Sequence, residues 1–172
     1  MELDKTFLQN SKNILGIVNI TPDSFSGDGL FKKENKLSKL LDFAERNNIS
    51  NLDIGCASSK PGYENVATQD ELNRLNYFLS NVKGNFSLSI DTSNPIVAEL
   101  ALKNNFKILN DINGFEDEEL ITKAIEYQCN VIIVHRHPES KHLHEKMNYR
   151  NNLKEVLEHL EQKVSQLIDK GI

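Results

Sequence analysis

The chain has 172 residues, of which 38% are hydrophobic and 26% are charged, and its formal net charge is −5 at pH 7. That length suits one domain with a buried core, and an acidic chain without a basic block argues against nucleic acid as a partner. No apolar run approaches the roughly 18 residues that cross a bilayer, and the first residues lack the basic-then-apolar order of a secretion signal, so no membrane partner is expected.

The most informative stretch covers residues 14–29. Residues 14–19 are mostly apolar and β-branched, which predicts a buried strand. The following Thr-Pro-Asp-Ser and the glycines at 27 and 29 predict a loop. Asn19 stands at the carboxyl end of the strand, the edge at which parallel α/β folds bind their ligands. Asn19 is therefore a candidate binding residue.

Strand and helix patterns then alternate to the end of the chain. Further strands are expected at residues 49–54, 86–91, 106–112 and 130–135, and helices near residues 37–44, 68–82, 96–103, 118–127 and 153–168. Thr68 and Glu71 have the spacing of a capping box. Asn94 and Pro95 form a good N-cap and first-turn pair, and Gly171 ends the last helix.

Five β-then-α units in series predict a parallel sheet with right-handed crossovers. The units could form an open doubly wound sheet or part of a (β/α)8 barrel. No unit carries a G-x-G-x-x-G turn and the polar residues gather at the strand ends, which favours the barrel. Spacing alone does not decide between the two.

Polar residues occupy equivalent positions near the carboxyl ends of all the expected strands: Asn19, Asp53, Asp91, Asn110 and His135. One such Asp is usually a turn former or a helix cap. A parallel sheet brings the whole set onto one rim, which indicates a binding site.

Histidines cluster after the fifth strand, at residues 135, 137, 142 and 144. Zinc is one interpretation of this patch, but no cysteine or paired acid completes it at a recognised spacing. We expect a solvated loop there. Cys56 and Cys129 are far apart in the sequence, and neither belongs to a metal-ligand spacing or a disulfide framework. This predicts free thiols and a cytoplasmic location.

Residues 14–29, Ile-Leu-Gly-Ile-Val-Asn-Ile-Thr-Pro-Asp-Ser-Phe-Ser-Gly-Asp-Gly, closely resemble the signature of dihydropteroate synthases. Ser-Ile-Asp-Thr at 89–92 and Asn-Asp-Ile-Asn-Gly at 110–114 fit further motifs of that family. The resemblance runs from Ile14 to the end of the chain. It implies a TIM barrel, (β/α)8, of which this chain has the first five βα units as a partial parallel barrel.

The resemblance also implies an activity. Dihydropteroate synthases condense (7,8-dihydropterin-6-yl)methyl diphosphate with 4-aminobenzoate to give 7,8-dihydropteroate in folate biosynthesis, with Mg²⁺ as cofactor. By the same resemblance Asn19 meets the magnesium-bound diphosphate, and Asp53, Asp91 and Asn110 bind the pterin. Asp91 is in addition the candidate catalytic residue, because a carboxylate stabilises positive charge that develops on the pterin methylene.

The loop at residues 55–62 resembles the family pattern Gly-Glu-Ser-Thr-Arg-Pro-Gly with substitutions. Ser59 retains a hydroxyl for the substrate. Lys60 retains the charge of Arg but loses the bidentate fork that suits carboxylate or phosphate. Phe25, Lys60 and Pro61 are expected to frame the aminobenzoate pocket.

A whole barrel takes about 250 residues, so we expect residues 1–172 to form a single pterin-binding domain without strands six to eight. In the family those strands supply an Asp, a Lys and an Arg that bind the pterin and the diphosphate. Open edges at the first and fifth strands invite pairing in a homodimer or with a complementing chain.

Two alternatives to an active synthase follow. One is an inactive pterin-binding remnant, or a subunit that another chain completes. The other is a pterin-dependent methyltransferase, which shares the Asp and Asn but is not expected to carry the sequence of residues 19–25.

Overall fold

The structure is a computed structural model that describes residues 14–22, 30–32, 34–57, 66–135 and 151–172. Its elements in chain order are β1 (Leu15–Asn19), α2 (Glu34–Arg46), β2 (Asn51–Gly55), α3 (Thr68–Asn81), β3 (Ser87–Asp91), α4 (Pro95–Lys103), β4 (Ile108–Asp111), α5 (Glu118–Glu126), β5 (Asn130–Ile133) and α6 (Asn152–Lys170). The alternation of strands and helices predicted from the sequence is confirmed. Among the described residues, no helix has the length and apolar character that crossing a membrane requires.

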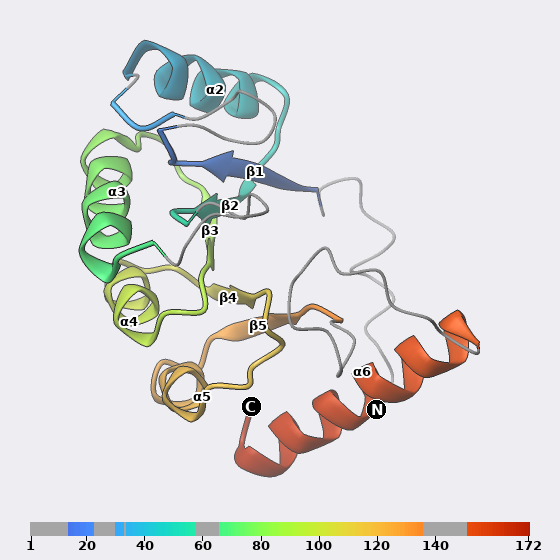
Figure 1. Cartoon of the computed structure of the whole chain (residues 1–172). Helices are drawn as coiled ribbons and strands as arrows, with labels where there is room; N and C mark the ends of the chain where they lie inside the picture. Colours follow the sequence, from blue (N-terminus) through green and yellow to red (C-terminus); the bar gives the residue numbers. More distant parts are fainter. Residues whose placement is uncertain (1–13, 23–29, 33, 58–65, 136–150) are drawn as a thin grey trace.

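The strands form one parallel five-stranded sheet in the order β1-β2-β3-β4-β5. Helices α2 to α5 lie along one face of this sheet, while α6 lies beyond β5 (Figure 1). Because all the pairings are parallel, every strand of this sheet ends at the same edge. In the described part of the chain β1 and β5 are the edge strands, as predicted.

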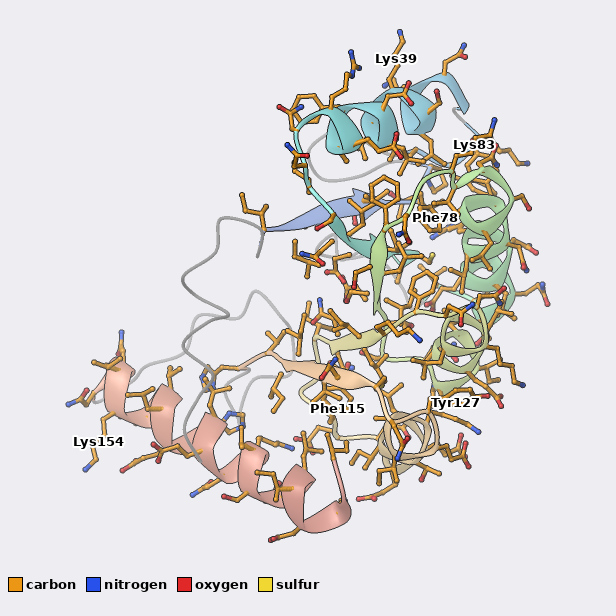
Figure 2. The ribbon with its side chains drawn as sticks, turned by 180° about the vertical axis from the view of Figure 1, so that it is seen from behind. Lys39, Phe78, Lys83, Phe115, Tyr127 and Lys154 are labelled. Carbon is orange, nitrogen blue, oxygen red and sulfur yellow. The ribbon has the colours of Figure 1, made fainter. Side chains whose placement is uncertain are left out.

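The helix-facing side of the sheet is the hydrophobic core. Val18, Ile54, Ile90 and Leu109 follow one another in register across four strands, and each is 0% exposed. Phe78 lies between α3 and the strands (Figure 2), and its ring meets that of Phe106 edge-on at 6.4 Å. Burial of this apolar row fixes the register, since a one-residue slip would turn it to the other face.

The opposite face of the sheet is the inner face, and its residues alternate with those of the core. The row at the carboxyl ends of the strands consists of Asn19, Gly55, Asp91 and Asn110, which are in register with one another. The fold therefore places side chains from four strands in one line at the edge where ligands bind in parallel folds.

Helix starts agree with the sequence at α4 but not at α3. Asn94 is the N-cap of α4 and accepts a hydrogen bond from the Ile96 amide, as predicted. The capping box of α3 is wrong, because Ala67 is the N-cap and makes no side-chain bond. Thr68 and Glu71 instead turn toward the segment after β3, where Thr68 accepts from the Asn94 side chain and Glu71 from Thr92.

Helix α6 is attached to the rest of the chain mainly near its carboxyl end. Leu167 is buried, and Lys163 and Lys170 pair with Glu116 and Glu118 at the start of α5. Farther toward the amino-terminal end, Leu153 is 71% exposed. The apolar residues predicted for this helix are thus only partly covered by the described residues.

Candidate functional site

Asn19 and Asp91 meet above Gly55 on the inner face. A Cβ atom placed on Gly55 would lie 2.7 Å from Asn19 Oδ1 and 3.8 Å from Asp91 Oδ2. The first distance is shorter than any real contact of a Cβ atom, so a side chain at residue 55 would displace the Asn19 amide. Glycine at this position lets a carboxamide and a carboxylate from β1 and β3 converge.

Asp53 lies one row deeper than predicted. Strand β2 ends at Gly55, so Asp53 stands inside the strand, in register with Ser89. Residues two apart in a strand face the same way, which puts Asp53 on the inner face beneath Gly55. Asn110 Nδ2 donates to Asp53 Oδ2 at 2.9 Å. The prediction that Asp53 sits at the strand end is wrong, but its carboxylate still belongs to the same cluster.

Several buried polar atoms of this cluster have no partner among the described residues: Asp53 Oδ1, Asn110 Oδ1 and Ser89 Oγ. Unpaired buried polar groups are costly and rare, because each has lost its hydrogen bonds to water. Two of the three are pure acceptors. The cluster is therefore chemically suited to a ligand that presents several N–H donors.

Sequence reasoning did not single out Ser89. A serine within an alternating strand reads as an ordinary solvent-facing residue, yet Ser89 is 0% exposed. The available signal was its position two residues before Asp91, which places both on the inner face.

The environment of Asp91 raises the pKa of its carboxyl from 3.8 to about 7. Burial is the largest cause, followed by the negative charges of Asp53, Asp111 and Glu71. A carboxyl that titrates near neutral pH is typical of functional sites. Asp91 can therefore change between charged and neutral forms under ordinary conditions.

Helix α3 contacts the site from the core side of the sheet. Glu71, 6% exposed, accepts a hydrogen bond from Thr92 Oγ1 at 3.1 Å, and burial raises its pKa. Arg74 donates to the Cys56 carbonyl at 2.7 Å. Burial, reinforced by the charge of Glu71, raises the pKa of the Cys56 thiol to about 12, so this free cysteine is inert as a nucleophile.

Asp111 has a structural role, although it directly follows the site residue Asn110 in the chain. It faces the helices, is 1% exposed, and accepts from the Ser93 hydroxyl and from the amides of Asn113 and Phe115 at 3.0 and 2.7 Å. These bonds fold the loop between β4 and α5.

His135 lies two residues beyond β5 and pairs with a histidine that the sequence reasoning missed. Its Nδ1 lies 2.9 Å from Nδ1 of His159 on α6, with the rings edge-on. His137, His142 and His144 lie outside the described residues. Within the described ranges no group of three or more His, Cys, Asp or Glu could bind a metal ion.

The remaining predicted site residues, Phe25, Ser59, Lys60 and Pro61, also lie outside the described residues. The structure thus brings together Asn19, Asp53, Asp91 and Asn110, and Ser89 belongs to the same cluster. His135 does not, because it contacts His159 on α6 instead.

A series of βα units with acids and amides converging on the carboxyl edge of a parallel sheet defines a ligand-binding α/β protein of the barrel class. Comparison with known families agrees: the chain matches the family described as "Pterin binding enzyme" over residues 15–172. The chain belongs to this family.

Individual relatives are dihydropteroate synthases. The enzyme of Streptococcus pyogenes is 30% identical over 175 residues, a match that includes 100% of this chain and 63% of the relative. The "bifunctional dihydropteroate synthase/dihydropteroate reductase" of Helicobacter pylori is 32% identical over 152 residues, with 86% of this chain and 40% of the relative covered. The chain thus spans less than two thirds of the length of these relatives.

Solved structures support the barrel. Dihydropteroate synthase of Yersinia pestis, in complex with a sulfonamide drug, superposes with a TM-score of 0.76 at 26% identity, covering 92% of this chain and 58% of that one. The Xanthomonas albilineans enzyme with 4-aminobenzoic acid gives 0.76 at 27% identity, with 92% and 56% covered. The five βα units are therefore part of a TIM barrel, as predicted, and not a doubly wound sheet.

Proposed function

We propose that the inner face of this sheet binds the pterin ring of (7,8-dihydropterin-6-yl)methyl diphosphate, and that the chain acts in the synthesis of 7,8-dihydropteroate. The observation that carries the proposal is a cluster of buried acceptors beside the Asp91 carboxylate: Asp53 Oδ1 and Asn110 Oδ1, which have no hydrogen-bond partner among the described residues. A ligand that supplies donors to them removes their desolvation penalty.

The chemistry of a pterin suits this cluster. Its pyrimidine edge carries an amino group, a ring N–H and a carbonyl, which pair with a carboxylate and a carboxamide. Asp53 and Asp91 accept from the donor groups. The Ser89 hydroxyl, which both donates and accepts, lies in the same register row as Asp53.

The reaction is a substitution at the pterin methylene. The bond between this carbon and the diphosphate oxygen breaks, and both electrons leave with the diphosphate. The amine of 4-aminobenzoate forms the new C–N bond and then loses a proton to solvent. Asp91 in its charged form stabilises the positive charge that spreads over the pterin methylene, and the rigid strand ends hold the reactants in place.

The Asn19 side chain is suited to bind a magnesium ion that protein and substrate oxygens would coordinate together. Mg²⁺ prefers oxygen ligands and usually keeps several waters, with one or two protein oxygens and phosphate oxygens completing its shell. The Asn19 amide oxygen lies over Gly55, next to the Asp91 carboxylate. When bound, Mg²⁺ neutralises charge on the leaving diphosphate.

The proposal also includes residues and partners that are supported by the sequence and not by the described structure. Phe25, Lys60 and Pro61 would frame 4-aminobenzoate, and Ser59 would bind the pterin substrate. We propose a single pterin-binding domain over residues 1–172, in the cytoplasm, where Cys56 and Cys129 would stay reduced. Among the described residues β1 and β5 are the edge strands of the sheet, and edge strands favour association with a second copy or with a complementing chain.

Isothermal titration with the dihydropterin diphosphate and Mg²⁺ tests this function, with Asn110→Ala as the site variant and Asn73→Ala on the exposed face of α3 as the matched control. We expect binding by the wild type and the control, and an affinity loss of about tenfold or more in Asn110→Ala. Absence of binding by a folded wild type, or equal affinities in all three, would contradict the proposal. Addition of 4-aminobenzoate then measures whether the chain completes turnover alone.

A further inference from the structure

Two residues one helical turn apart on α3 contact the segments that follow β2 and β3. Resting on the function proposed above, we propose that Glu71 and Arg74 are positioning residues for the site: they fix, from the core side of the sheet, the strand ends that present Gly55 and Asp91. Neither residue faces the ligand side.

Glu71 acts on the end of β3 through Thr92, the residue after Asp91. Thr92 is 4% exposed, donates its hydroxyl to Glu71, and accepts at the same oxygen from the Asn94 amide at 3.1 Å. The Thr92 amide donates to the Asn110 carbonyl at 3.0 Å. With these bonds Thr92 is restrained on several sides, so the orientation of Asp91 depends on the acceptor that Glu71 provides.

Arg74 acts on the end of β2 through Cys56, the residue after Gly55. Its guanidinium donates to the Cys56 carbonyl across the gap between α3 and β2, at 2.7 Å. Residues three apart on a helix share a face, so Glu71 and Arg74 contact neighbouring strands together. One helix turn thereby holds both segments that follow the paired residues Gly55 and Asp91, next to the place where the Asn19 and Asp91 side chains converge.

The Thr92 hydroxyl requires an acceptor at residue 71. Gln would keep an oxygen at this position that can accept the Thr92 hydrogen bond, whereas Ala would leave the hydroxyl without it.

The substitution Glu71→Gln is the conservative variant, because Gln keeps an oxygen that accepts from Thr92. Asp70→Asn is the matched control: it changes a neighbouring but exposed acid of the same helix turn and should leave the site unchanged.

Two further variants test the positioning contacts. Glu71→Ala removes the acceptor of Thr92, and Arg74→Met removes the donor to Cys56. Each should weaken binding of the dihydropterin diphosphate by about tenfold, while Glu71→Gln should retain most of the affinity because it keeps the acceptor of Thr92. Far-UV circular dichroism and thermal melting identify the folded variants that enter the comparison.

The outcomes separate this inference from the proposed function. Wild-type affinity in folded Glu71→Ala and Arg74→Met overturns the positioning role. Amide resonances of Gly55 and Asp91 in the ligand-free protein give a second readout: they should shift in Glu71→Ala and Arg74→Met but not in Asp70→Asn. A wild type that binds no pterin, but shows these shifts in the two variants, counts against the proposed function and leaves the positioning role of α3 supported.

Discussion

Asp91 combines partial burial with the negative charges of three neighbouring acids. The charged form of its carboxyl is therefore less stable than that of an ordinary aspartate. Such a disfavoured charge is common at residues that serve binding at a cost in stability. At the scale of the residue, function and stability should respond in opposite directions when this carboxyl is removed.

The substitution Asp91→Asn should abolish detectable pterin binding and stabilise the fold at alkaline pH. The folded-state pKa is raised from 3.8 to about 7, so ionisation has no cost below the lower value and reduces stability as pH rises through the higher one. Each pKa unit corresponds to about 1.4 kcal/mol, and since Asp91 is only partly buried we expect about 2 kcal/mol of added stability at pH 8. Urea unfolding at pH 8 and pH 4 measures this, and a variant less stable than wild type at pH 8 would contradict the assigned environment.

Gly55→Ala should disturb the site without a large loss of stability. The added methyl group would come within 2.7 Å of Asn19 Oδ1 and force this amide away from Asp91. We expect affinity for the dihydropterin diphosphate to fall by about tenfold. Gly16→Ala is the matched control, because its Cβ would meet Leu52 Cδ2 at 3.2 Å, Ile49 Cγ2 at 3.3 Å and the Asn51 carbonyl oxygen at 3.7 Å, and no residue of the site. Equal affinities of the two variants in calorimetry would show that Gly55 has no such role.

At the scale of the element, the strands and helices were predictable because period and composition agree along the whole chain. The apolar run before Asn19 predicts a strand and the Asn94-Pro95 pair a helix start, and the structure confirms both elements. The predicted burial of the whole run is wrong, because Val18 faces the core whereas Ile17, on the inner face, is 69% exposed among the described residues. The capping box failed because tertiary contacts outweigh local ones: Thr68 and Glu71 pair with residues after β3. No local pattern distinguishes a capping glutamate from one that is buried against another strand.

The loop between β4 and α5 offers a stability prediction with an internal comparison. Asp111→Ala would leave the amides of Asn113 and Phe115 and the Ser93 hydroxyl without their buried acceptor, and we expect a loss of about 3 kcal/mol. Asp117→Ala removes the exposed N-cap of α5, which accepts from the Glu119 and Leu120 amides, and should cost about 1 kcal/mol. Chemical denaturation compares the two, and equal losses would mean that Asp111 is not the structural centre of the loop.

At the scale of the whole molecule, the site exists because the sheet register aligns residues far apart in the sequence. Sequence placed Asn19, Asp91 and Asn110 at strand ends, and the parallel order then puts them in one row. Sequence did not reveal that Asp53 is one row deeper, because this depends on where β2 ends and how it pairs with β3. The spacing of Ser89 from Asp91 gave its face, but not that Ser89 is in register with Asp53. The α6 contacts were equally hidden, because His159 gives no local sign that it meets His135.

Pterin affinity should depend on pH through Asp91. The charged carboxylate accepts hydrogen bonds from the pterin edge, whereas the protonated form loses part of that capacity. With a pKa of about 7 for Asp91, the affinity should rise between pH 6 and pH 8 and level off above that range. Calorimetry across this range measures the effect at constant Mg²⁺. An affinity that stays flat or falls with rising pH would show that the charged form of Asp91 is not the form that binds.

The most direct test of the account is the structure of the chain with a bound 6-hydroxymethylpterin phosphate, determined by crystallography. The account predicts the pyrimidine edge of the pterin on the inner face of the sheet, with its N–H groups within about 3 Å of the Asp53, Asp91 and Asn110 oxygens. A pterin bound elsewhere, with these oxygens still unpaired, would contradict the central claim that they form the pterin site.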